Sequence, residues 1–130
     1  MDVFKILKEK YPNIRFELYP RERDMSVLLT GFIVPHKLRG TGIGSKFMED
    51  LIKIADEHGY KIKLSPSNSY GGNVNRLFDF YGRFGFVRNK GENIDDTHKE
   101  DMYRNPIKSN YVENLNEQLE RIKCIINSII

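Results

Sequence analysis

The spacing of hydrophobic positions changes along the chain, and these changes predict the order of its elements. Apolar and polar residues alternate over 14–19, which indicates a half-buried strand. A polar turn is expected over 20–24. The run 26–34 is apolar at nearly every position, which is typical of a central strand covered on both faces. Apolar residues then recur at helical spacing over 47–55, and Gly59 follows as a stop signal.

Shorter elements are predicted on either side. A helix over 2–11 is expected, capped by Asp2 and stopped by Pro12. Residues 60–64 predict a second short strand, and 77–84 a second amphipathic helix closed by Gly85. Strands at 86–87 and 99–104 are expected to pair across a polar loop. Because a helix connects the strands at 26–34 and 60–64, we expect these two to be parallel neighbours in an α/β sheet.

The end of the chain carries an apolar stripe whose members are three and four residues apart. Its members are Val112, Leu115, Leu119, Ile122, Ile126 and Ile129. We therefore predict a domain over 1–107 and a C-terminal amphipathic helix over 108–130. The stripe fits equally well a helix packed on its own chain and a homodimer formed through 112–129.

Composition narrows the class of protein. A chain of 130 residues is long enough to build one core without metal or disulfide staples. Its net charge of +3, with no dense Lys/Arg cluster, suits an anionic ligand but does not favour nucleic acid. The single cysteine, Cys124, excludes an internal disulfide, and the first residues predict neither a signal peptide nor a membrane span. We expect a cytoplasmic protein, bacterial or, if phage-encoded, in the host cytoplasm.

A glycine-rich turn stands between the strand predicted at 26–34 and the helix predicted to begin near Ser45. It reads Arg39-Gly40-Thr41-Gly42-Ile43-Gly44. Glycines let several backbone N–H groups approach one anion, and a helix N-terminus adds partial positive charge at the same place. A tight turn that binds nothing is the alternative, although three glycines cost more conformational entropy than such a turn needs.

Two motifs resemble those of the GNAT superfamily of N-acetyltransferases. Val34, Arg39, Gly42 and Gly44 match its acyl-CoA-binding motif, and the segment 80–86 is similar to its second motif, an aromatic pair followed by Gly-Phe. The resemblance covers 26–87, with weaker continuation to Arg104. It implies a mixed, mostly antiparallel sheet with a central parallel pair of strands, flanked by helices.

The resemblance also implies an activity, the transfer of an acetyl group from acetyl-CoA to a primary amine of a protein or small molecule. By the same resemblance, the backbone of 39–45 (Arg39, Gly40, Thr41, Gly42, Ile43, Gly44, Ser45) would hold the pyrophosphate. Phe32, Ile33 and Val34 would bond the pantetheine arm like an added strand. Asn73 and Asn75 flank the register of a cofactor-contacting asparagine, although either could cap the helix instead.

Tyr81 is the candidate general acid, because the resemblance places a tyrosine here near the thioester sulfur. A core tyrosine is the alternative, since apolar residues share its helix face. The strand 26–34 contains no carboxylate to act as base. Glu17, Glu22, Asp24 and His36 are all within plausible reach of the cleft, and deprotonation through water is an equal alternative.

Other features carry weaker signals. Asp95, Asp96 and His98 match no rigid metal geometry, so we predict a polar loop and no metal site. Only one short helix is predicted before Ile14, which leaves the acceptor side open unless the C-terminal helix covers it. A second hypothesis is therefore a catalytically silent GNAT-fold interaction module that acts through its C-terminal helix.

Overall fold

The computed structural model describes residues 2–66 and 74–107. Two helical turns at His36–Leu38 and Gly91–Asn93 lie between the main elements. The main elements are α1 (Lys5–Lys10), β1 (Arg15–Arg21), β2 (Ser26–Ile33), α2 (Ile43–His58), β3 (Lys61–Leu64), α3 (Val74–Gly82), β4 (Val87–Arg88) and β5 (Met102–Arg104). The predicted C-terminal helix, its possible dimer contact and Cys124 lie outside the described residues.

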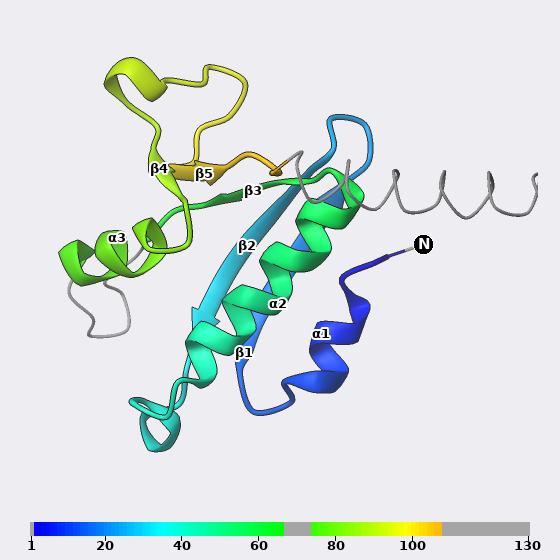
Figure 1. The fold of residues 1–130 in the computed structure, drawn as a ribbon, viewed down its shortest axis with the longest axis vertical. Helices are drawn as coiled ribbons and strands as arrows, with labels where there is room; N and C mark the ends of the chain where they lie inside the picture. Colours follow the sequence, from blue (N-terminus) through cyan, green and yellow to red (C-terminus); the bar gives the residue numbers. More distant parts are fainter. Residues whose placement is uncertain (1, 67–73, 108–130) are drawn as a thin grey trace, which may run out of the picture.

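The strands form one sheet in the order β1-β2-β3-β5-β4 (Figure 1). The central pair β2–β3 is parallel, and all other neighbours are antiparallel. Helix α2 connects the parallel pair, as the sequence predicts. The mixed, mostly antiparallel sheet is thereby confirmed.

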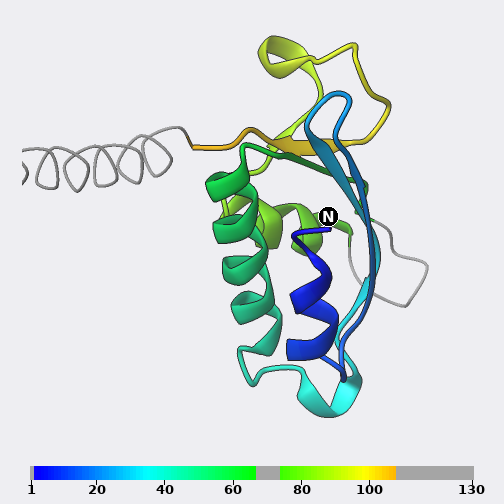
Figure 2. The same cartoon turned by 90° about the vertical axis from the view of Figure 1, so that its right-hand side faces the viewer.

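Helices α1 and α2 lie on the same face of the β1–β2 hairpin (Figure 2). The core between these layers is built from side chains that are almost completely buried, such as Phe16, Val27, Phe47, Leu51 and Ile62. The prediction that 26–34 is covered on both faces is wrong for most of its length. In the described parts of the chain, Leu28 and Thr30 are only half-buried, because no helix packs on their side of the sheet.

A β-bulge changes the direction of the side chains at the end of β2. The pairs Arg15–Ile33 and Glu17–Thr30 enclose one residue more on β2 than on β1, and Gly31 has φ +60°. An extra residue in a strand reverses the alternation beyond it. Phe32 therefore points into the core and stacks on Phe47, with ring centroids 5.0 Å apart.

Several predicted boundaries need correction. Pro20 belongs to β1, not to the turn, because on an edge strand its missing N–H can face away from the sheet. Asp2 accepts a bond from the N–H of Phe4, so it precedes the helix, and Phe4 takes the cap position. Helix α3 ends at Gly82, and Gly85, with φ +90°, closes the turn that follows. No helix in residues 2–66 or 74–107 has the length and apolar character to span a membrane.

Candidate functional site

A pocket of about 620 Å³ opens between the end of β2, the glycine-rich loop and α3. Its lining combines three separate segments of the chain. The lining residues are Phe32, Ile33, Val34, Leu38, Arg39, Gly40, Gly42, Gly44, Ser45, Leu77, Phe80 and Arg83. The structure therefore brings most of the residues expected to contact a cofactor around one cavity.

The glycine loop leaves the N-terminus of α2 open toward this pocket. Gly40 and Gly42 have φ +81° and +84°, a region that side chains other than glycine rarely adopt. Gly42 is the N-cap, no side chain caps the helix, and the first intrahelical bond runs from Lys46 N to Gly42 O at 3.0 Å. Among the described residues, the N–H groups of 43–45 therefore have no carbonyl acceptor, which is the usual state of a helix start.

Two side-chain bonds hold the loop in shape. Arg39 Nε donates to the carbonyl of Val34 at 3.2 Å, and the hydroxyl of Thr41 donates to the carbonyl of Leu38 at 2.5 Å. Gly44 allows the helix to approach the strand closely, since a Cβ there would lie 3.2 Å from Val34 Cγ2. Thr41 is exposed and Ile43 packs on the core, and neither lines the pocket.

One edge of β2 is unpaired beside the pocket. The parallel pairing with β3 ends at Leu28–Lys63, whereas β2 continues to Ile33. In the described segments, no strand pairs with the β3-facing edge of β2 beyond Leu28. Backbone groups on such an edge can bond an extended ligand as they would a further strand.

Helix α3 forms the opposite wall through Leu77 and Phe80, together with Arg83 directly after its last residue. The ring of Phe80 is stacked at 6.5 Å from that of Phe32, so an aromatic layer joins this wall to β2. Sequence reasoning missed four lining residues: Leu38, Leu77, Phe80 and Arg83. The three-residue spacing of 77, 80 and 83, which puts them on one helix face, is the signal that could have identified the α3 wall.

Tyr81 lies in the core beside this wall and is only 5% exposed. Its ring packs edge-on against Phe80 at 5.3 Å and tilted against Phe86 at 5.8 Å. Burial raises the pKa of the Tyr81 hydroxyl to about 12. Tyr81 does not itself line the pocket. Asn75 is exposed in the first turn of α3 and is not a lining residue either, and Asn73 lies outside the described residues.

The carboxylates considered as bases are not gathered at the pocket. Glu22 and Asp24 lie in the β1–β2 hairpin, at the opposite end of the eight-residue strand β2. That length corresponds to roughly 25 Å, so the expectation that these two reach the cleft is wrong. Glu17 lies 3.4 Å from Lys8 Nζ, and His36 is exposed in the turn beside the loop. Neither lines the pocket.

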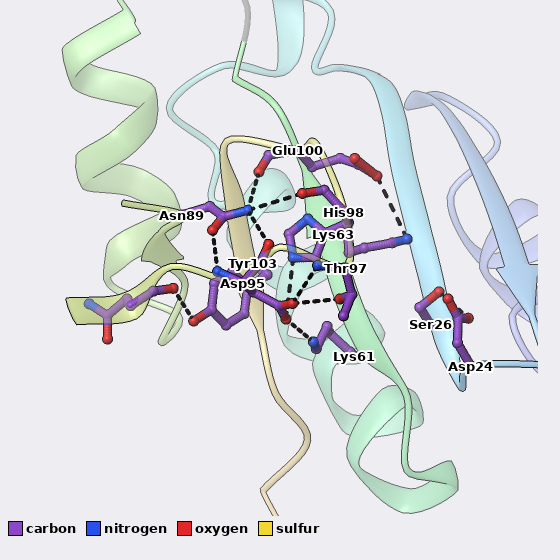
Figure 3. Close-up of polar contacts among 11 residues, drawn as sticks. Asp24, Ser26, Lys61, Lys63, Asn89, Asp95, Thr97, His98, Glu100 and Tyr103 are labelled. Carbon is purple, nitrogen blue, oxygen red and sulfur yellow. Dashed lines mark hydrogen bonds and ion pairs between the residues drawn. The ribbon is translucent and has the colours of Figure 1, made fainter. Parts of the chain in front are cut away.

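The loop between β4 and β5 folds over the face of the sheet opposite to α1 and α2 (Figure 3). Asp95 binds Lys61 and Thr97, and the Lys61 ammonium holds the pKa of this carboxyl well below its usual range. The side chain of His98 is buried, with Nε2 3.7 Å from Asp95 Oδ2, and among the described residues neither ring nitrogen has a hydrogen-bond partner. Within the described residues, no three histidine, cysteine or acidic side chains converge as metal ligands.

Comparisons with known proteins bear on the fold. No protein-family model and no curated protein matches the chain. The structure is similar to a protein from Bacteroides thetaiotaomicron that is described as a GNAT-family acetyltransferase, with a TM-score of 0.50 and 15% sequence identity. The match covers 88% of this chain and 67% of that one. Ard1 from Thermoplasma volcanium gives a TM-score of 0.49 and 16% identity over 79% and 77%.

A protein assigned as an N-acetyltransferase from Lactobacillus plantarum gives a TM-score of 0.47 and 16% identity over 72% of this chain. This chain spans 60% of the length of that protein. At such identities the likeness concerns the fold alone. Together with the parallel central pair of strands and the glycine turn at the start of α2, the similarity to the Bacteroides thetaiotaomicron protein confirms the expected fold, that of GNAT N-acetyltransferases.

Proposed function

We propose that this protein is an N-acetyltransferase that passes the acetyl group of acetyl-CoA directly to a primary amine. The observation that carries the proposal is the convergence of three features on one pocket: the open N-terminus of α2, the unpaired edge of β2 and the apolar wall of α3. The helix N-terminus suits a phosphate group, and the unpaired strand edge suits an arm that contains amides. The apolar wall suits the methylene groups of that arm. Acetyl-CoA combines all three.

The glycine loop is the proposed pyrophosphate site. The unpaired N–H groups of 43–45 and the positive end of α2 favour an anion at this point. Arg39 and Arg83 add two guanidinium groups to the pocket lining, and such groups bind phosphate oxygens with charge-assisted hydrogen bonds. A side chain at position 42 would stand where the phosphate has to approach.

The end of β2 is the proposed site of the pantetheine arm. Its amides would bond to the free backbone edge between Leu29 and Ile33, while Phe32, Leu77 and Phe80 contact the apolar stretches. An N–H group of this edge that points at the thioester carbonyl would stabilise the oxyanion of the tetrahedral intermediate.

Tyr81 is the proposed general acid for the departing thiolate. Its raised pKa keeps the hydroxyl protonated at neutral pH, which is the form that an acid requires. No carboxylate lines the described pocket, so we propose that the acceptor ammonium loses its proton to water. The amine nitrogen then attacks the carbonyl carbon, the carbon–sulfur bond breaks, and Tyr81 protonates the departing sulfur. The second proton that the nitrogen loses on forming the amide returns through water to the Tyr81 phenolate.

The test is thiol release from acetyl-CoA in the presence of three amines, with acetylation checked by mass spectrometry. The amines are a lysine peptide with a blocked N-terminus, a lysine-free peptide with a free N-terminus, and a polyamine. We expect acceptor-dependent release with one of these classes. Binding of acetyl-CoA without release or acetylation on any acceptor would contradict the proposed transfer.

A further inference from the structure

A buried ion pair joins α2, whose N-terminus opens to the pocket, to strand β5. Asp56 lies in the last turns of α2 and is 2% exposed, and Arg104, at the end of β5, is 5% exposed. Arg104 Nη1 and Nη2 donate to Asp56 Oδ1 and Oδ2 at 2.6 and 3.1 Å, and the N–H of Ile107 donates to Oδ1 at 3.0 Å. The carboxylate is thus bonded on both oxygens.

The same guanidinium also holds the turn that follows α3. Arg104 Nε donates to the carbonyl of Phe84 at 2.9 Å. Gly85 provides the room, since a Cβ at that position would lie 3.3 Å from Arg104 Nε. The turn is tied back to the helix, because the N–H groups of Phe84 and Phe86 both donate to the carbonyl of Tyr81 at 3.0 and 3.3 Å.

Arg104 therefore connects α2 to the C-terminal end of α3. The last turn of α3 meets the pocket through Phe80, whose ring stacks on Phe32 and contacts Phe84 edge-on at 5.2 Å. In the part of the chain that the structure describes, Arg104 is the side chain that hydrogen-bonds the turn after α3. Without it, α3 could pivot about Phe80 and carry Tyr81 with it.

The energetics of buried ion pairs also favour a role in geometry over a role in stability. Desolvation of two charges offsets most of their attraction, so a well-packed apolar pair is often as stable. What a bidentate pair supplies is a fixed geometry. We infer that Arg104 and Asp56 are positioning residues that set the distance between α2 and α3 and so hold Tyr81 against the acyl-donor pocket. The inference rests on the proposed function for its catalytic consequence, but not for its structural one.

The experiment replaces both partners in the full chain, Asp56→Leu with Arg104→Met, which leaves no orphaned charge. A second variant, Arg104→Lys, keeps the charge opposite Asp56 but loses the fork that reaches Asp56 and Phe84 together. The control is Lys63→Met, which also removes a buried cation. Its only described ion-pair partner is Glu100, 3.7 Å away on the face of the sheet opposite to α2.

We expect the double variant to stay folded but to unfold below the parent temperature, because the N–H of Ile107 and the carbonyl of Phe84 lose their side-chain partners. We also expect kcat to fall at least about tenfold in the double variant and in Arg104→Lys, with a displaced pH profile, because small displacements of catalytic groups cost that much. Amide resonances of 77–83 should shift in both variants without ligand. They should not shift in Lys63→Met.

Unchanged resonances of 77–83, or an unfolded double variant together with an Arg104→Lys protein identical to the parent, would overturn the inference. Unchanged kcat and pH profile in a parent that turns over would also overturn it. If the parent neither binds nor turns over acetyl-CoA, the proposed function fails by itself. The amide resonances of 77–83 then still decide whether Arg104 and Asp56 position α3.

Discussion

Alanine substitutions at Gly44 and Gly82 test the close approach of α2 to β2 through both protein stability and acetyl-CoA binding. A Cβ at this position would lie 3.2 Å from Val34 Cγ2 and 3.9 Å from the rings of Phe32 and Phe80. At Gly82, in α3, an added Cβ would have nothing within 4 Å, and this glycine does not line the pocket. Neither glycine has a positive φ, so alanine fits the backbone at both sites.

Both substitutions gain the same favourable contribution to the free energy of unfolding, but only Gly44→Ala has an unfavourable contribution as well. Replacing a helical glycine by alanine stabilises by up to about 1 kcal/mol. Overpacking against Val34 costs about 1–2 kcal/mol at Gly44 only. Gly44→Ala should therefore have a free energy of unfolding about 1–2 kcal/mol below that of Gly82→Ala, or a melting temperature lower by roughly 4–8 °C.

Binding should separate the variants further. The methyl group of Gly44→Ala enters the pocket wall among Val34, Phe32 and Phe80, and we expect acetyl-CoA affinity to fall about tenfold, equivalent to ~1.4 kcal/mol. Gly82→Ala should bind as the parent does. Far-UV circular dichroism and calorimetric titration measure the two quantities. Equal melting temperatures and equal affinities in both variants would refute the close approach of α2 to β2 at this site.

Three further predictions concern single side chains. Tyr81→Phe should lower kcat about 100-fold with acetyl-CoA KM unchanged, whereas Tyr60→Phe, which also removes the hydroxyl of a buried tyrosine, should not. Equal rates in steady-state assays would exclude Tyr81 as the acid. Arg83→Ala should weaken acetyl-CoA binding about three- to tenfold and reduce its salt dependence. Arg76→Ala, in α3 but off the pocket lining, should change little in titrations at two salt concentrations. Burial lowers the pKa of His98, so the unfolded chain takes up its proton first as the pH falls. The free energy of unfolding should then decrease from about pH 6.5 downward, and His98→Phe should remove that decrease in denaturant titrations; an identical pH dependence in the variant would contradict it.

The sequence predicts the helices and the long strands because burial imposes a regular period on them. The spacing over 47–55 gives α2, and the crossover gives the parallel pair. Boundaries depend on more local effects. Pro20 looks like a turn residue until its edge position in β1 is known. Asp2 looks like a cap, but its carboxylate accepts from the N–H of Phe4, and Phe4 takes the cap position two residues later.

The candidate site divides in the same way. The glycine loop is visible in the sequence because its conformation requires particular residues, as the positive φ values of Gly40 and Gly42 illustrate. Arg83 is not visible as a lining residue, because a lone arginine on a helix has the same pattern whether it faces a pocket or solvent. The bulge at Gly31, which turns Phe32 inward, depends on pairing with β1 and leaves no periodic trace.

The most direct test of the acyl-donor site is calorimetric titration of acetyl-CoA into the parent, Gly42→Asp and Gly59→Asp. Gly42 and Gly59 are the N-cap and the C-cap of α2, with φ of 84° and 75°, and a Cβ at either would have open space around it. We predict that the parent and Gly59→Asp bind alike and that Gly42→Asp loses binding at least about tenfold, because its carboxylate repels the pyrophosphate. A parent that does not bind, or equal affinity in all three proteins, would contradict the proposed site.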